Sequence, residues 1–189
     1  MRHRKLIAVG TCATLALAAT GVAGAKKQRP PTRATIKAVQ TIAAKPNRFV
    51  KDGLRWNKDV YHVRSGGTLH VTVGKIVFPE GPHTFTVVRK RDLPRTTKRI
   101  LECKICETLA VAHGVDPNNP EAPPRFRFLE NGVGQTTPPN VDQPGDSAIV
   151  GPNGARGESV DLPVTAKKGT TLRFMCLVHP WMQAKVIVG

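Results

Sequence analysis

Hydrophobic and polar positions alternate along several short stretches of the chain. Within "DVYHVRSGGTLHVTV", residues 59–73, Tyr61 and Val63 fall on one face of an extended segment. After a Ser-Gly-Gly turn, Leu69 and Val71 again share one face, with polar residues on the other. Alternation with a period of two is typical of half-buried strands, and the turn between the two stretches predicts that they pair as a hairpin.

The same pattern returns at the C-terminal end. In "KKGTTLRFMC", Leu172, Phe174 and Cys176 share one face after a glycine turn, and "AKVIV" forms a last strand. The segment "HTFTVV", residues 83–88, also has strand character. Short strands with turn signals between them, in a chain with 16 Pro and 17 Gly, predict an all-β fold, a Greek-key sandwich.

The middle of the chain has a different period. Apolar residues recur there at helical spacing: Leu101, Ile105, Leu109 and Ala112. Thr96 or Thr97 is the expected N-cap of this helix, and Gly114 is its expected end. Residues 115–158 are rich in Pro, Gly and Asn and predict a long irregular loop. We therefore interpret about 90–158 as a partly helical insertion between two core strands.

The N-terminal segment has the composition of an export signal. Residues 1–25 combine the basic start "MRHRK", an apolar run of small residues and an A-x-A site at Ala23 to Ala25. The alternative is an uncleaved membrane anchor, because about 20 apolar residues can span a bilayer. Residues 26–46 are basic and interrupted by prolines, which predicts a flexible tether before a single domain over 47–189.

The charge of the chain indicates what kind of partner it binds. The formal net charge is +16 at pH 7, which favours anionic partners such as acidic proteins or an anionic surface. A solvated, soluble surface explains the same charge equally well. Export and the lack of aromatic residues interleaved with the basic ones argue against nucleic acid.

Three side chains near the end of the chain carry candidate chemistry. In "CLVHPWM", Cys176, His179 and Met182 follow one another at intervals of three, and Pro180 restricts the backbone between the last two. A buried structural thiol would explain Cys176 alone. Thiolate, imidazole and thioether together favour copper over calcium, magnesium or structural zinc. A blue copper centre of this kind needs one further imidazole.

His83 is the best candidate for that second imidazole. It follows the turn "PEGP" and begins a strand, so it can reach the end of the sandwich where Cys176 terminates another strand. His62 and His70 fall on the polar faces of strands and are expected at the surface. His113 closes the predicted helix, where its positive form would suit the helix dipole.

The chain resembles the cupredoxins, especially the amicyanin and plastocyanin branch. The resemblance lies in C-x-x-H-P-x-M running into a final strand, in "GPHTFTV", and in "WNKDVYHVRSGGTLHVTV", and it covers about 50–90 and 159–189. It implies one type 1 copper, held by His83, Cys176 and His179 near one plane with Met182 as a weak axial ligand. It further implies a secreted, periplasmic or cell-surface carrier of single electrons between redox partner proteins, not an enzyme.

The resemblance also assigns neighbours of the copper. The backbone N–H of Thr84 would support the Cys176 sulfur and affect the reduction potential. The ring edge of His179 would face the surface, framed by Pro82, Pro180 and Trp181, and would give electrons a short route out. Trp181 has an alternative role in simple loop packing.

Cys103 and Cys106 form a C-x-x-C motif inside the predicted helix. Oxidising export favours a disulfide between them, which would leave Cys176 as the free thiol of the mature chain. Free thiols, or a second metal site with His113, remain alternatives. A second site would suit a different function, extracytoplasmic copper sequestration or delivery. No repeated H-x-H motif of a multicopper oxidase is present.

Overall fold

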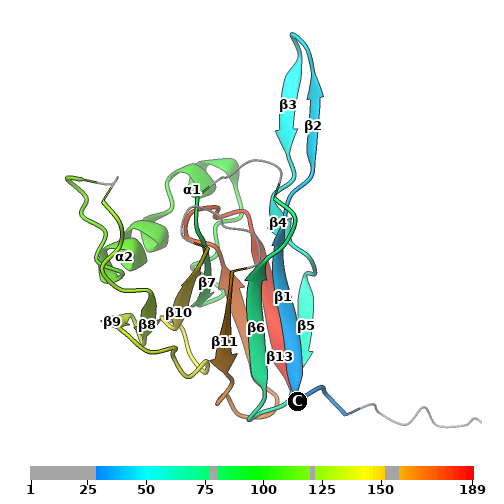
Figure 1. Cartoon of the computed structure of the whole chain (residues 1–189), viewed down its shortest axis with the longest axis vertical. Coiled ribbons are helices and arrows are strands. Elements are labelled where there is room, and N and C mark those ends of the chain that lie inside the picture. Colours follow the sequence, from blue (N-terminus) through cyan, green and yellow to red (C-terminus); the bar gives the residue numbers. More distant parts are fainter. Residues whose placement is uncertain (1–28, 77–80, 120–121, 152–157) are drawn as a thin grey trace, which may run out of the picture.

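The chain folds into two β-sheets that face each other across one hydrophobic core (Figure 1). The computed structural model describes residues 29–76, 81–119, 122–151 and 158–189. In that part of the chain the first sheet has four strands, in the order β11 (Ser159–Pro163), β6 (Thr68–Val73), β1 (Arg33–Val39) and β4 (Arg55–Trp56).

The second sheet of the described residues is larger and has seven strands. Its order is β5 (Val60–Val63), β13 (Gln183–Val188), β12 (Thr171–Met175), β7 (His83–Val88), β10 (Ser147–Val150), β8 (Phe128–Glu130) and β9 (Val133–Gln135). Together the two sheets confirm the predicted Greek-key β-sandwich.

Aromatic rings fill the centre of the core. The Phe174 ring lies 4.5 Å from that of Phe85, 5.5 Å from that of Trp56 and 6.0 Å from that of Tyr61, measured between centroids. All four residues are buried. Burial of such side chains supplies the main stabilisation of the sandwich, because each removes a large apolar area from water.

The prediction of a flexible tether over 26–46 is wrong for most of its length. Residues 33–39 form β1, which pairs in parallel with β6 and antiparallel with β4. Ile36 of this strand is fully buried in the core. The domain therefore begins before residue 47, and the alternation in "RATIKAV" was the signal that the basic and proline-rich composition concealed.

The predicted hairpin between residues 60–63 and 68–73 is also wrong. Both segments are strands, and their predicted inner faces are buried. However, β5 pairs with β13 in the second sheet, whereas β6 pairs with β1 and β11 in the first. The turn at Gly66 thus carries the chain from one sheet to the other, and the two strands do not pair.

The insertion contains two short helices where the sequence predicts one. These are α1 (Thr97–Leu101) and α2 (Lys104–Ala112). The Thr96 hydroxyl accepts a hydrogen bond from the Arg99 N–H, and Gly114 follows α2 with a φ of 78°, so both expected ends are confirmed. Leu101 is exposed because α1 ends at this residue, so Leu101 does not share the buried face of α2.

The rest of the insertion is more regular than predicted. β8 and β10 extend the second sheet beyond β7, and their residues are largely buried. The prediction of an irregular loop over 115–158 is therefore wrong for these strands and for β9. β10 pairs with β7, which is distant in sequence, and Pro and Gly residues around all three strands dominate the local pattern.

Two strands stand apart from the sandwich. β2 (Ile42–Lys45) and β3 (Phe49–Asp52) pair with each other and form a hairpin that projects from one end of the molecule (Figure 1). The predicted export signal over residues 1–25 lies outside the described residues. Within the described part of the chain, no helix has the length and apolarity needed to cross a membrane.

The place of β1 in the core predicts the effect of a truncation within it. We expect Ile36→Ala to lower the free energy of unfolding by about 2–5 kcal/mol, because it removes a buried side chain and leaves a cavity. The neighbouring exposed Lys37 is a matched control, and Lys37→Ala should change stability by less than about 0.5 kcal/mol. Urea denaturation measures both, and equal effects would contradict the assignment of β1 to the core.

Candidate metal centre

Antiparallel pairing of β12 with β7 brings the candidate ligands to one end of the sandwich. Phe174 is paired with Val87, and Met175 with Thr86. Because the strands run in opposite directions, the residue that follows β12 lies beside the beginning of β7. Cys176 follows β12, and His83 is the first residue of β7.

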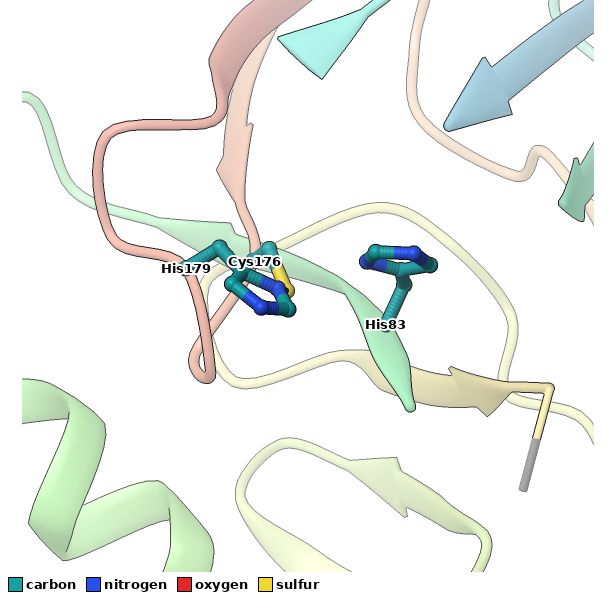
Figure 2. Close-up of side chains that lie close together, drawn as sticks. All are labelled: His83, Cys176 and His179. Carbon is teal, nitrogen blue, oxygen red and sulfur yellow. Dashed lines mark hydrogen bonds between the residues drawn. The ribbon is translucent and has the colours of Figure 1, made fainter. Parts of the chain in front are cut away.

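His83, Cys176 and His179 converge at this end (Figure 2). One donor atom from each, two ring nitrogens and the sulfur, lie within 4.8 Å of one another. Cys176 Sγ is 3.6 Å from His179 Nδ1, and the two imidazole centroids are 5.1 Å apart. All three side chains are buried, with 1%, 0% and 4% of their surface exposed.

The loop between Cys176 and Met182 is closed by its own backbone. The Met182 N–H donates to the His179 carbonyl at 2.8 Å, and the Cys176 N–H donates to the Met182 carbonyl at 3.0 Å. The Trp56 indole N–H donates to the same Met182 carbonyl at 3.1 Å. Met182 is 1% exposed and belongs to the same buried cluster as Cys176. These bonds fix the backbone that carries the ligand side chains.

The Cys176 sulfur has the neighbour that the sequence predicts. The Thr84 backbone N–H donates to Sγ at 3.3 Å. Burial raises the pKa of the Cys176 thiol, and the Thr84 hydrogen bond opposes that shift. The thiol is therefore protonated at neutral pH when no metal is present, and binding of a cation must displace its proton.

His83 has an environment that favours the neutral imidazole. Burial, and to a smaller extent the nearby His179 ring, lowers the pKa of His83 to about 4. In the described residues, neither Nδ1 nor Nε2 of His83 has a hydrogen-bond partner. An unsatisfied buried polar atom costs about 1–3 kcal/mol, so a neutral imidazole held in this way is poised to coordinate a cation.

The donor set fits copper. Two imidazoles and one thiolate in a buried cluster, with a thioether in the same loop, are the ligands of a trigonal copper site with a weak axial sulfur. A bound cation would coordinate a His83 nitrogen that has no hydrogen-bond partner in the described residues, and it would also compensate the negative charge of the buried thiolate. We therefore assign His83, Cys176 and His179 as the residues that would hold copper, with Met182 beside them.

A chain of buried hydrogen bonds leads from the insertion to the ligand loop. Thr84 Oγ1 accepts from the Leu177 N–H at 2.7 Å and from the Thr86 hydroxyl at 3.0 Å. Thr86 Oγ1 also lies 2.7 Å from Ser147 Oγ, which lies 2.9 Å from His113 Nε2. Every member of this chain is buried, so it fixes the position of the loop beside Cys176.

The sequence did not predict this chain, although β7 carried a signal for it. Thr84 and Thr86 alternate in a strand whose residues are all buried, and buried hydroxyls require internal partners. Trp56 was missed as well, since its bond to the Met182 carbonyl joins strands that are distant in sequence.

The remaining histidines lie away from the cluster. His62 is exposed, and His70 pairs with Asp161 at 2.6 Å. His113 caps α2 but is 1% exposed, and burial lowers its pKa. The expectation of a positive His113 at the helix end is therefore wrong, because burial disfavours the charged imidazole more than the hydrogen bond between Nδ1 and the Phe126 carbonyl favours it.

The predicted electron-transfer surface is partly covered. His179 is 4% exposed, and Trp181, which is 46% exposed, packs edge-on against its ring at a centroid distance of 5.3 Å. Pro82 is half-buried and Pro180 is buried. Trp181 thus both packs the loop and forms part of its exposed surface, with its indole N–H bonded to the Leu54 carbonyl at 3.0 Å.

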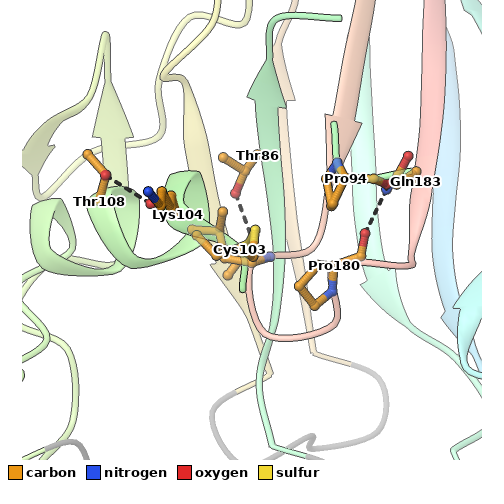
Figure 3. The surroundings of a disulfide bond; sticks show 10 residues. Thr86, Pro94, Cys103, Lys104, Thr108, Pro180 and Gln183 are labelled. Carbon is orange, nitrogen blue, oxygen red and sulfur yellow. Dashed lines mark hydrogen bonds between the residues drawn. A yellow bond between two sulfur atoms is a disulfide. The ribbon is translucent and has the colours of Figure 1, made fainter. Parts of the chain in front are cut away.

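Cys103 and Cys106 form a disulfide, as predicted (Figure 3). Both are buried in a cluster that includes Met175 and Leu177, which flank the ligand Cys176. Cys176 is the free cysteine of the described residues. In the disulfide form, residues 103 and 106 offer no thiolate to a second metal ion.

No protein-family model matches this chain, and no curated protein matches it in sequence. Among solved structures, it is similar to a dithionite-reduced auracyanin from Roseiflexus castenholzii, with 17% identity, 85% of this chain and 99% of that chain covered, and a TM-score of 0.44. It is also similar to auracyanin A, described as a "blue" copper protein from Chloroflexus aurantiacus. That match has 16% identity, covers 83% of this chain and 99% of that chain, and has a TM-score of 0.38.

A reduced Cu(I) form of an amicyanin variant gives 12% identity, 82% of each chain and a TM-score of 0.36. The fold and the ligand cluster agree with the resemblance to cupredoxins found in the sequence. The assignment of the copper ligands rests on the donor atoms of His83, Cys176 and His179.

Burial of His83 predicts how acid affects the metal-free protein. The unfolded chain binds a proton at His83 near pH 6.5, whereas the folded protein does so only near pH 4. Stability contributed at this residue is therefore present above pH 6.5 and is lost as pH falls from 6.5 to 4. Urea denaturation across this range should show a smaller loss in His83→Gln, with His62→Gln, an exposed control, behaving as wild type.

The hydroxyl of Thr84 provides a second test. We expect Thr84→Val to lower the free energy of unfolding of the metal-free protein by about 1–3 kcal/mol, because the Leu177 N–H loses its acceptor in the core. Thr171→Val, on the exposed side of β12, makes the same chemical change outside this chain and should have little effect. Equal urea midpoints for the two variants would contradict a structural role for the buried chain.

Proposed function

We propose that this protein is a blue copper protein of the cupredoxin type that carries single electrons between redox partner proteins. One observation carries the proposal: a buried sulfur and two imidazole nitrogens lie within 4.8 Å of one another at the end of a rigid β-sandwich. Bound copper supplies a one-electron couple, Cu(II)/Cu(I). The protein transforms no substrate in this role.

The residues around the site suit electron transfer because they restrict movement. The backbone bonds of Met182 and the Thr84 hydroxyl hold the ligand loop, so the donor atoms keep their places when the charge of the site changes. The Thr84 N–H stabilises negative charge on the Cys176 sulfur. Little reorganisation of ligands is what rapid exchange of a single electron requires.

Trp181 is the proposed exit for the electron. Its ring lies against His179 on one side and is 46% exposed on the other, so it connects a buried ligand with the surface. Pro180 directly precedes Trp181 in the chain, and Pro82 directly precedes the candidate ligand His83. A redox partner that contacts Trp181 would come within a short distance of His179 without opening the site.

We further propose that the protein works outside the cytoplasm. The disulfide between Cys103 and Cys106 supports this, because disulfides persist in oxidising compartments. The basic leader over residues 1–25 is consistent with export. The net charge of +16 favours acidic partners.

Copper sequestration or delivery receives no specific support. That function needs a second acceptor site, and the candidate thiols at 103 and 106 are joined in a disulfide. Stoichiometry separates the two functions. An electron carrier holds one tightly bound copper per chain, whereas a delivery protein exchanges two or more.

The visible and EPR spectra of the copper-loaded protein test the proposal. We expect an intense blue colour in the oxidised form, bleaching on reduction and one copper per chain, because a Cys176 thiolate would be coordinated. Cys176→Ser should abolish the colour. The paired Cys103→Ser, Cys106→Ser variant is the control, since it removes two sulfurs and leaves the ligand set intact. A colourless copper-loaded wild type would falsify the assignment.

A further inference from the structure

Seven of the eight strand residues in the hairpin of β2 and β3 are exposed, and the proposed function does not use this hairpin. In the described residues its two strands pair with each other and with no other strand. It projects from the end of the sandwich at which the ligand loop, residues 176–182, lies (Figure 1). An isolated two-stranded ribbon is only marginally stable in water, so a contact with another molecule would suit it.

The surface of the hairpin is both apolar and basic. Phe49 and Val50 are 51% and 75% exposed and lie next to each other in β3, so they form apolar surface on the hairpin. Lys45, Arg48 and Lys51 surround them and are exposed as well. In the register of the hairpin Lys45 is opposite Phe49, so a positive charge and an aromatic ring share one face.

The charge of this surface is of one sign. Residues 43–51 contain no acid, and Asp52, at the base of β3, accepts a hydrogen bond from the Gln40 side chain at 3.0 Å. An acidic surface would therefore meet three cations with no opposing carboxylate at the tip. Such complementarity steers association and fixes orientation more than it adds affinity.

The base of the hairpin is bonded to the ligand loop. Gly53, directly after β3, donates its N–H to the Thr41 carbonyl at 2.7 Å and closes the ribbon. The next carbonyl, of Leu54, accepts the indole N–H of Trp181, and that ring packs against His179. A molecule seated on the hairpin is thus held beside the proposed exit for electrons.

We propose that the β2–β3 hairpin docks an acidic redox partner protein, and that it orients this partner toward Trp181. Carboxylates of the partner pair with Lys45, Arg48 and Lys51, and apolar groups of the partner contact Phe49 on one face of the ribbon and Val50 on the other. The bond between Trp181 and the base of the hairpin favours a protein that exchanges electrons over a lipid surface, which exchanges none. The proposal rests on the proposed function and names the partner surface for it.

Electron exchange with cytochromes c of known charge tests the proposal. The full chain loaded with Cu(I) is mixed at low ionic strength, in a stopped-flow instrument, with an oxidised cytochrome c of net negative charge or with a basic one. The haem Fe(III) gains the electron that Cu(I) loses. We expect wild type to react faster with the acidic protein. The variant Lys45→Glu, Arg48→Glu, Lys51→Glu should lose roughly tenfold or more of that second-order rate constant, because steering at the tip is reversed.

A matched variant changes the same charge at the opposite end of the sandwich. Arg64, Lys167 and Lys168 are exposed and lie in turns where β5 ends and before β12 begins, far from the ligand loop. Reversing these three to Glu should lower the rate constant far less than reversal at the hairpin. Equal losses in the two variants would overturn the proposal, as would a wild type that shows no preference for the acidic cytochrome.

The apolar tip has its own variant, Phe49→Ser, Val50→Ser. Both residues are exposed, so the sandwich and the blue colour should be retained, and saturation of the rate with acidic cytochrome should require a higher concentration. Unchanged saturation would exclude the tip from the docking surface.

Two further measurements separate the possible failures. Oxidation of the reduced copper protein by hexacyanoferrate(III), in which Cu(I) loses the electron that Fe(III) gains, reports the proposed function without a protein partner. If it proceeds but the hairpin variants react with acidic cytochrome as wild type does, only the docking proposal fails. If phosphatidylglycerol vesicles bind wild type and not the hairpin variants, while the cytochrome rates are unaffected, the hairpin binds lipid and the proposal is overturned.

Discussion

The pairing of β12 with β7 is the constraint on which the site depends. It places the Cys176 sulfur within hydrogen-bonding distance of the Thr84 N–H, although 92 positions separate them in the chain. His83 precedes Thr84 and therefore arrives at the same point. His179 follows three residues after Cys176, in a loop closed by its own backbone bonds. One strand register thus assembles donors that no local segment could bring together.

Burial gives these donors their chemical character. A solvated imidazole would be protonated in mild acid and a solvated thiol would be open to oxidation, whereas here desolvation keeps His83 neutral and Cys176 protonated in the absence of metal. Burying these polar donors costs free energy, and burial of the apolar core around Phe85 and Phe174 offsets that cost. The same core prevents the donors from relaxing, which is the property that a one-electron site needs.

The long insertion, about residues 90–158, contacts the ligand loop and helps to hold it in place. Its strand β10 pairs with β7, and Ser147 of that strand joins the hydrogen bonds that end at the Leu177 N–H. Its disulfide packs against Leu177 and Met175, on either side of the ligand. At the other edge, the β2–β3 hairpin reaches the ligand loop through Leu54 and Trp181. Three peripheral elements therefore converge on one short loop.

The sequence by itself determined the strand faces, the helix ends at Thr96 and Gly114, and the candidate ligands, because periodicity, capping and donor chemistry are local properties. The sequence could not determine which strands pair with each other. The alternation that identifies β5 and β6 does not indicate which sheet each strand joins. The strand character of β1 was missed because its neighbours in sequence are basic and rich in proline. Only the tertiary structure decided that His113 is buried and neutral, that Trp181 covers His179, and that Thr84, Thr86 and Ser147 form one chain, because those facts depend on contacts between segments distant in sequence.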